Sequence, residues 1–228
     1  MLLFVDCCIS PRGDRSRSHA LCEAFLEEYR KSHPAMDIET VNLQRMALKP
    51  FDQFSTDDRN ALRRVKAFDA PIFELANQFR RADRIVIGAP LRDLTFPAML
   101  RVYIEYICVR EVTYHYEGKE SKGDCMATKL AYLNVSGGPE PEENLGVEYW
   151  RQLSERFGIR EFYHVDAYGL DIEPEKSEAI MAEACDKARA LAKEFCHVEA
   201  YGLDTRPEEG EAIMAAACEK AKELAETF

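Results

Sequence analysis

Short apolar runs alternate with longer amphipathic stretches along most of this chain. Residues 2–5 (LLFV), 85–89 (IVIGA) and 129–135 (KLAYLNV) are apolar runs typical of buried parallel strands. Residues 37–43 (DIETVNL) and 161–168 (EFYHVDAY) complete a set of five strands. The stretches between them carry apolar residues at helical spacing. Strands and helices that alternate in this way predict an α/β fold with a parallel sheet.

The expected helices follow the same spacing. The first begins after a cap at Ser16 or Ser18, and its apolar stripe is Leu21, Cys22, Phe25, Leu26 and Tyr29. Others are expected over residues 70–81, 96–109, 142–157 and 174–195, with Pro97 in the first turn of the second of these. Residues 44–68 form a loop with a short helix near 57–65. Residues 112–116 (VTYHY) are strand-like and turn at Glu117-Gly118.

The end of the chain repeats what precedes it. Residues 164–195 match residues 197–228 at 21 of 32 positions, and HVDAYGLD recurs as HVEAYGLD. Two copies are too few for a solenoid, so this is a duplicated strand–helix unit. We expect a domain over residues 1–195, and residues 196–228 as an extension of it that adds a sixth parallel strand and a helix. In the alternative, the second copy takes the place of the first, in its own subunit or a neighbour's. Either arrangement should affect stability or assembly rather than chemistry.

Composition excludes several classes of function. The 228 residues carry a formal charge of −11, which argues against a nucleic acid or an anionic membrane as partner. No apolar run approaches the ~20 residues of a membrane span, and the first residues lack the pattern of a signal peptide. A cytoplasmic protein is therefore expected, with its eight cysteines as reduced, packed thiols. The cysteines form no CxxC pair, so no metal site is expected.

Three loops leave the carboxyl ends of the predicted strands, where open parallel sheets bind ligands. The first, residues 10–18, offers hydroxyl groups beside a helix N-terminus, which suits a phosphate; the plainer alternative is that these serines only cap the helix. The second, residues 90–97 (PLRDLTFP), has a proline at each end and suits a flat heterocycle. The third, residues 135–139 (VSGGP), has two glycines that allow close approach of a ligand.

In combination, these motifs resemble one known family. The segment IVIGAPLRDLTFPAMLRVYIEYI followed by VTYHYEG, together with Ser10, Ser16-Arg17-Ser18 and the later VSGG, is similar to the flavodoxin-like NAD(P)H-dependent oxidoreductases, which include FMN-dependent azoreductases and quinone reductases. The resemblance covers residues 1 to about 195. It implies a flavodoxin-like three-layer sandwich with strand order 2-1-3-4-5, a homodimer and bound FMN.

The resemblance also implies a set of cofactor-binding residues. The FMN phosphate would be held by Ser10, Ser16, Arg17 and Ser18. The isoalloxazine ring would be bracketed by Leu91, Arg92, Asp93 and Leu94, and its pyrimidine side lined by Val135, Ser136, Gly137 and Gly138. This chain departs from the azoreductase pattern, because residues 91–94 lack the usual aromatic side chains and the third loop lacks the usual arginine.

The implied activity is the transfer of hydride from NADH or NADPH, through flavin N5, to a quinone-like or azo-like acceptor in a ping-pong mechanism. The flavin would carry the chemistry, so no side chain is assigned a catalytic role, and His115 in the hairpin is the one histidine with a chance of facing the site. The hairpin at residues 112–116 favours a reductase, since it would build a wall over the ring and a dimer surface. The alternative is a non-enzymatic electron carrier, which the charge of −11 fits, or a flavin-free binding module.

Overall fold

Five parallel strands form the central sheet of the protein, in a computed structural model that describes residues 1–9, 16–195, 215 and 219. The strands are β1 (Leu2–Asp6), β2 (Ile38–Asn42), β3 (Arg84–Pro90), β6 (Lys129–Val135) and β7 (Glu161–Ala167). Their order across the sheet is β2-β1-β3-β6-β7, and every neighbouring pair is parallel. Counted among themselves, these strands have the predicted order 2-1-3-4-5, so the predicted flavodoxin-like topology is confirmed.

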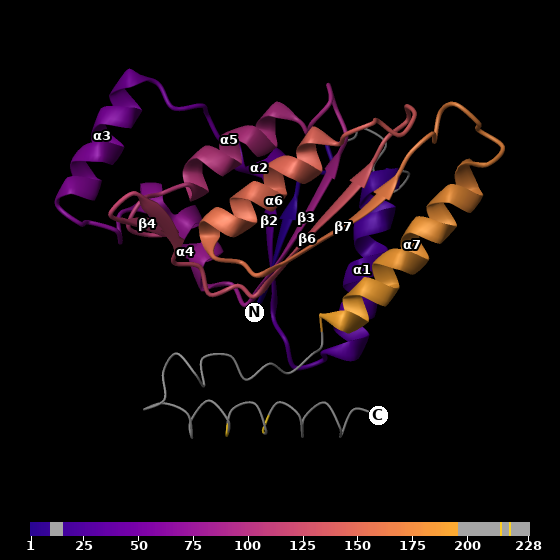
Figure 1. Cartoon of the computed structure of the whole chain (residues 1–228), viewed down its shortest axis with the longest axis horizontal. Helices are drawn as coiled ribbons and strands as arrows, with labels where there is room; N and C mark the ends of the chain where they lie inside the picture. Colours follow the sequence, from indigo (N-terminus) through magenta and orange to yellow (C-terminus); the bar gives the residue numbers. More distant parts are fainter. Residues whose placement is uncertain (10–15, 196–214, 216–218, 220–228) are drawn as a thin grey trace.

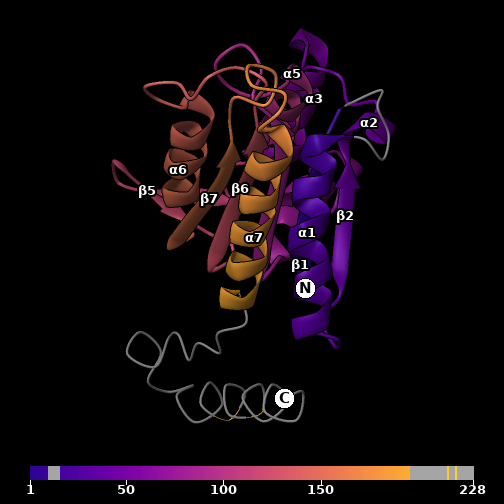
Figure 2. The same cartoon turned by 90° about the vertical axis from the view of Figure 1, so that its right-hand side faces the viewer.

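Helices cover both faces of the sheet and complete a three-layer sandwich (Figures 1 and 2). One face is covered by α1 (Arg17–Ser32) and α7 (Ser177–Glu194), which lie side by side. The other is covered by α4 (Glu74–Arg81), α5 (Ala98–Ile107) and α6 (Leu145–Phe157). Each face of the sheet has its own hydrophobic core, and side chains of β6 alternate between the two. Leu130 and Tyr132 pack toward α5 and α6, whereas Ala131 and Leu133 pack toward α1 and α7.

The segment between β2 and α4 is more helical than predicted. A short helix, α2 (Leu43–Met46), follows β2 directly, and α3 is Gln53–Arg64 rather than the predicted 57–65. The earlier start has a local cause: Asp52 accepts a hydrogen bond from the Ser55 backbone N–H at 2.8 Å, and the Asp52 backbone N–H donates to Ser55 Oγ at 2.9 Å. The predicted helix at 70–81 begins as a 3₁₀ turn, η2 (Pro71–Phe73), and Pro97 is the cap before α5 rather than part of it.

A two-stranded antiparallel hairpin, β4 (Tyr114–Glu117) and β5 (Glu120–Gly123), lies outside the main sheet. It turns at Gly118 as predicted, but β4 begins two residues later than expected. Thr113 is fully buried, and its hydroxyl donates to the Ile107 carbonyl at 2.7 Å, which holds the chain in a turn at the end of α5. The strand can therefore begin only after Thr113.

The predicted sixth strand and last helix fall on residues 196–228, which lie outside the described residues apart from Ala215 and Glu219. That arrangement and the division of the chain at residue 195 remain predictions. Among the helices that the structure does describe, none combines the length and the apolar character needed to cross a membrane.

Candidate cofactor site at the carboxyl edge of the sheet

The carboxyl ends of β1, β3, β6 and β7 and the start of α1 lie at one edge of the sheet because the strands are parallel (Figure 1). Three loops at this edge were predicted to form the site. The structure adds the fourth, residues 168–173, which is hydrogen-bonded to the loop after β6 and to the start of α1.

The start of α1 presents two buried hydroxyl groups. Ser16 is the N-cap, and its Oγ accepts a hydrogen bond from the His19 backbone N–H at 3.4 Å, as predicted for a capping serine. The Ser16 and Ser18 residues are only 4% and 7% exposed. The first N–H groups of a helix and its dipole attract anions, so this end of α1 suits a phosphate. Ser10 lies outside the described residues.

Arg17 joins two loops. One guanidinium nitrogen donates to the Leu170 carbonyl at 2.8 Å, and another donates to Asp171 Oδ1 at 2.7 Å. The side chain is thus directed to the loop after β7. Its backbone N–H belongs to the first turn of α1 and remains with Ser16 and Ser18 at the anion-attracting end of the helix.

The second loop has an unusual backbone. Arg92 and Thr95 exchange backbone hydrogen bonds of 3.2 and 3.0 Å and close a two-residue turn. Its central residues, Asp93 and Leu94, have φ angles of 48° and 71°, in the left-handed region that non-glycine residues rarely adopt. Leu94 is 68% exposed, so core packing does not account for this conformation. Consecutive strained residues at a loop tip are typical of ligand-binding sites.

The third loop is held by its neighbours. The Leu91 backbone N–H donates to the Val135 carbonyl at 2.8 Å, which joins the second and third loops. Ser136 Oγ accepts from the Gly138 N–H at 3.1 Å. A Cβ on Gly137 would lie 2.0 Å from Asp171 Oδ2, whereas a Cβ on Gly138 would meet only Ser136 Oγ, at 3.7 Å. Gly137 therefore makes room for Asp171, and Gly138 is the glycine whose side is open to a ligand.

The fourth loop was not predicted as part of the site. The Gly169 N–H donates to the Gly138 carbonyl at 2.7 Å, and the Asp171 N–H donates to the Gly137 carbonyl at 2.9 Å. Together with the Arg17–Asp171 ion pair, these bonds link the first, third and fourth loops. The sequence feature that could have indicated this loop is the segment AYGLD, which occurs in both copies of the repeat.

A layer of hydrogen-bonded polar residues lies between the sheet and the third and fourth loops. Asn134, fully buried in β6, donates to Asp166 of β7, and Asn144 donates to the Tyr168 hydroxyl at 2.8 Å. Asn144 also caps α6 by accepting from the Gly146 N–H at 2.9 Å. Within the described part of the chain, the Tyr132 hydroxyl is buried without a hydrogen-bond partner. This layer fixes the loops to β6, β7 and α6.

The cysteines near the first loop behave as packed thiols. Cys7 is fully buried, and burial raises the pKa of its thiol to about 12. Cys8 and Cys22 lie with their Sγ atoms 3.7 Å apart, and the hydrogen bond to Cys22 is the main cause that raises the pKa of Cys8. A Cβ on Gly88 would lie 2.2 Å from the Cys22 sulfur, so this glycine leaves room for the pair. The raised pKa values keep the Cys7 and Cys8 thiols protonated near neutral pH.

The hairpin lies near the amino ends of the sheet strands, opposite the carboxyl edge where the four loops are. Gly123 packs against the backbone of Phe157 and Gly158, at the C-terminal end of α6, whereas the N-terminal end of α6 lies beside the fourth loop. The expectation that the hairpin walls the ring site is therefore wrong within one subunit.

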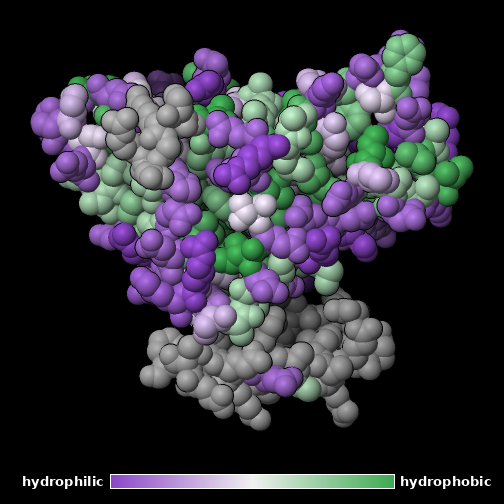
Figure 3. Space-filling model, turned by 180° about the vertical axis from the view of Figure 1, so that it is seen from behind, coloured by the Kyte–Doolittle hydropathy of each residue, from purple (hydrophilic) through white to green (hydrophobic). Residues whose placement is uncertain are grey.

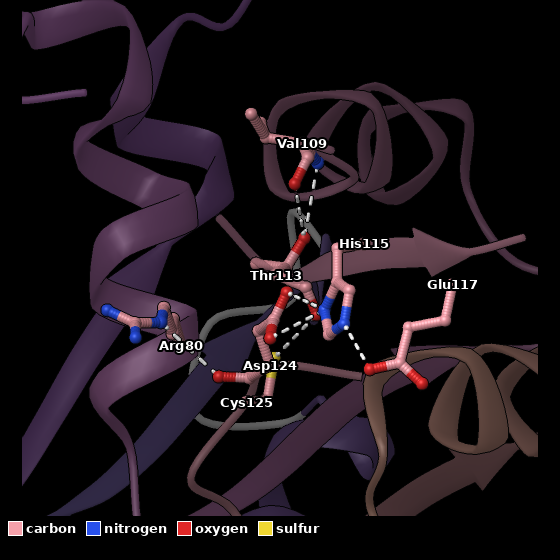
Figure 4. A network of polar contacts seen from close by, with 7 residues as sticks. All are labelled: Arg80, Val109, Thr113, His115, Glu117, Asp124 and Cys125. Carbon is pink, nitrogen blue, oxygen red and sulfur yellow. Dashed lines mark hydrogen bonds and ion pairs between the residues drawn. The ribbon is translucent and has the colours of Figure 1, made fainter. Parts of the chain in front are cut away.

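His115 belongs to a clasp that pins this hairpin (Figure 4). Its Nδ1 lies 2.9 Å from both carboxylate oxygens of Asp124, and its Nε2 lies 3.4 Å from Glu117. The Asp124 backbone accepts from Arg80 and donates to Thr113. We therefore assign His115 no part in the chemistry of its own subunit's site.

Comparisons with known proteins agree with this architecture. A family model described as a flavodoxin-like fold matches residues 3–192. FMN-dependent NADH:quinone oxidoreductase 2 of Clostridium acetobutylicum is 32% identical over 200 residues, which cover 84% of this chain and 98% of that protein. The corresponding enzyme of Clostridium beijerinckii is 29% identical, with the same coverage.

Solved structures share the fold. An azoreductase from Bacillus anthracis is 26% identical, with a TM-score of 0.73, and the match covers 85% of this chain and 98% of that one. The NAD(P)H:quinone oxidoreductase of Methanothermobacter marburgensis is 20% identical, with a TM-score of 0.63 over 87% of this chain and 96% of that one. With the sheet order, the loop arrangement and these matches together, the chain belongs to the flavodoxin-like family that includes the FMN-dependent NADH:quinone oxidoreductases and azoreductases.

Proposed function

We propose that this protein is an FMN-dependent NAD(P)H oxidoreductase that reduces quinone-like acceptors. The observation that carries the proposal is the pair of buried hydroxyls, Ser16 and Ser18, at the start of α1, on the same edge of the sheet as the strained turn at Asp93-Leu94 and the open side of Gly138. The names of the relatives, which are FMN-dependent NADH:quinone oxidoreductases, support it.

The phosphate end of FMN fits the residues present. Ser16 and Ser18 supply hydroxyl donors, and the first turn of α1, including the backbone N–H of Arg17, supplies a positive dipole end for a dianion. Ser10 is assigned to the same group from the family motif. The Arg17 side chain acts indirectly, by holding Asp171 and the fourth loop against the start of α1.

The ring end fits the second and third loops. Residues 91–94 and 135–138 are held together by the hydrogen bond from Leu91 to Val135. The Arg92 N–H is bonded to Thr95, so the amides of Asp93 and Leu94 are the candidates for stabilising negative charge on a bound ring. FMN, when bound, supplies hydride transfer at N5 from the nicotinamide to the acceptor. The chain's own residues bind and orient the cofactor.

Quinones are preferred over azo compounds as acceptors because the second loop has no aromatic side chain between Leu91 and Leu94 to stack on an extended aromatic substrate. We propose NADH as the first co-substrate to test, as in the names of the relatives, with NADPH as its alternative. The nicotinamide and the acceptor would use one site in turn, which gives ping-pong kinetics.

A homodimer is part of the proposal. The helix α3 has no buried residue in the single chain, and Phe54 on it is 79% exposed. An open hollow of about 1150 Å³ lies beside it, lined by residues of α3, α5 and α6. Figure 3 shows apolar side chains gathered at this end of the molecule, on the right. A second copy of the chain would cover this surface.

A cytoplasmic location is also proposed. The six cysteines within the described part of the chain are all free, and those nearest the site are protonated thiols, which suits a reducing compartment.

The test is a flavin titration followed by a turnover assay. The purified protein should bind FMN and should oxidise NADH or NADPH only when a benzoquinone is present, with parallel lines in double-reciprocal plots. FMN binding without nicotinamide oxidation would replace the proposal with an electron carrier. Failure to bind FMN would replace it with a flavin-free binding module.

A further inference from the structure

Residues 163–195 cover a surface that α1 and β6 form. The α7 helix packs against α1, and its buried side chains contact one core shared with β6 and β7. Phe195, fully buried, meets the ring of Phe25 edge-on at a centroid distance of 5.2 Å. We call the surface of α1 and β6 that β7, the fourth loop and α7 cover the C-terminal seat.

The second copy of the repeat carries every buried residue of the first. Eight residues are buried between positions 164 and 195: Val165, Ala167, Leu170, Ala184, Ala188, Leu191, Ala192 and Phe195. Their equivalents 33 positions later are identical: Val198, Ala200, Leu203, Ala217, Ala221, Leu224, Ala225 and Phe228. None of the positions at which the copies differ is buried in the first copy.

The residues that hold the loops also recur. Asp171, which accepts the hydrogen bond from Arg17, corresponds to Asp204. Gly169, whose N–H donates to Gly138, corresponds to Gly202. The second copy therefore has what it needs to make the same packing and the same loop contacts.

The alternative position, a sixth strand with its helix beside α7, offers a poorer surface. The side of α7 that faces neither α1 nor the sheet is exposed and carries the ion pair between Glu183 and Lys187 at 2.7 Å. A helix beside α7 would meet this charged surface along its flank, whereas the C-terminal seat matches the apolar stripe of the second copy residue for residue.

We propose that the C-terminal seat accepts either copy, and that residues 196–228 can replace residues 163–195 in it within the same chain. Two features favour the first copy in the unchanged protein. Lys193 lies 3.6 Å from Glu28 of α1, and its equivalent is Glu226, which would repel Glu28. Seating the second copy also lengthens the connection after α6 by 33 residues, and closing a longer loop costs entropy.

The test disables each copy in turn in the full chain. Ala188 is fully buried, so Ala188→Asp places a carboxylate in the seat and expels the first copy; Ala221→Asp is the matched change in the second copy. Each single variant should melt within a few degrees of the unchanged protein. The double variant should melt roughly 10 °C lower or lose its cooperative transition. If Ala188→Asp alone melts as low as the double variant, the second copy cannot fill the seat and the proposal is wrong.

Hydrogen exchange shows directly which copy is seated, because the two copies give distinguishable peptides. In Ala188→Asp, protection should move from residues 177–195 to residues 210–228, and adding Glu28→Lys should raise its melting temperature by removing the repulsion from Glu226. Unchanged positions of protection would overturn the proposal. Exchange between chains would overturn the same-chain assignment, and it would make the melting temperature of Ala188→Asp rise with protein concentration more than that of Ala221→Asp.

Discussion

At the scale of single residues, Ser16 has two roles that substitutions can separate. It caps α1, and it is buried where we propose that a phosphate binds. An Asp at this position caps a helix as well as Ser does, and it also suits the positive end of the dipole.

We therefore predict that Ser16→Asp folds with an unchanged melting temperature but binds FMN more weakly by at least about 1.5–3 kcal/mol, through loss of the hydroxyl bond and repulsion of the phosphate. Ser16→Ala should bind FMN more weakly and should also be less stable by about 1 kcal/mol, because the helix cap is missing. Thermal melts and fluorescence titration with FMN measure the two effects. FMN affinity unchanged in both variants would place the phosphate elsewhere.

Gly137 gives a second prediction at this scale. A Cβ there would lie 2.0 Å from the Asp171 carboxylate, so Gly137→Ala must displace Asp171 and break its ion pair with Arg17. The Asp171 side chain is 64% exposed and can turn away, so the change should lower the free energy of unfolding by only about 0.5–1 kcal/mol, the loss of a largely exposed ion pair. Gly138→Ala is the matched control, because its Cβ has only an ordinary contact at 3.7 Å. Urea unfolding that finds the two variants equally stable would contradict this account of Gly137.

The sequence predicts the capping role of Ser16 but not the contact between Gly137 and Asp171. Ser16 is predictable as a cap, because capping depends on residues three positions apart. The partner of Gly137 is Asp171, from a loop 34 residues later, and only the folded sheet brings the two together. The sequence assigns both glycines to a ligand, whereas the structure places the Asp171 carboxylate beside Gly137, and the role of Gly138 stays a prediction.

At the scale of elements, the hairpin is fixed by a titratable clasp. The hydrogen bond to Asp124 is the main cause that raises the pKa of His115 above its ordinary 6.5, and Glu117 adds to it. Because the folded pKa is the higher one, the stabilisation is fully present below the unfolded pKa. It is lost as the pH rises through the folded pKa.

We predict that the stability of the unchanged protein falls, relative to His115→Gln, as the pH is raised from below about 6.5. The sign follows from the loss of the charged imidazole that Asp124 binds. Unfolding by urea at a series of pH values, with Asp124→Asn as a second variant, measures the difference. If the difference in free energy of unfolding between His115→Gln and the unchanged protein is the same at every pH, the imidazole of His115 is not charged in the clasp.

Elements that depend on local signals were predicted well, and those that depend on distant partners less well. The bounds of β6 match the prediction residue for residue, because the apolar residues 130–133 lie at its centre and the turn-forming sequence SGGP follows it directly. The start of α3 was misjudged because Ser55 completes the capping box that the pattern of apolar residues does not show. The position of the hairpin was misjudged because it depends on Gly123 fitting against the end of α6.

At the scale of the whole molecule, the sheet order follows from right-handed crossovers between consecutive strands and from the family resemblance. The assembly depends on a surface that a single chain leaves uncovered. The α3 helix is held to α5 by Arg59, which donates to the Glu105 and Cys108 carbonyls at 3.1 and 2.7 Å, while Phe54 faces outward.

We predict that the protein is a dimer in solution and that Phe54→Glu shifts it toward the monomer at micromolar concentration, because the apolar contact is replaced by a charge. Ala190→Glu, an exposed position on α7 where the second copy already has Glu223, is the control and should stay dimeric. Sedimentation velocity measures both. A Phe54→Glu protein that remains fully dimeric would remove α3 from the interface.

If the N-terminal end of α1 binds the phosphate of FMN, the protein should distinguish FMN from riboflavin, which lacks that phosphate. Calorimetric titration of the flavin-free protein should show FMN binding more tightly than riboflavin by at least about 1.5–3 kcal/mol, and Ser16→Asp should remove most of that difference. Equal affinities for the two flavins in the unchanged protein would show that the N-terminal end of α1 does not bind the phosphate.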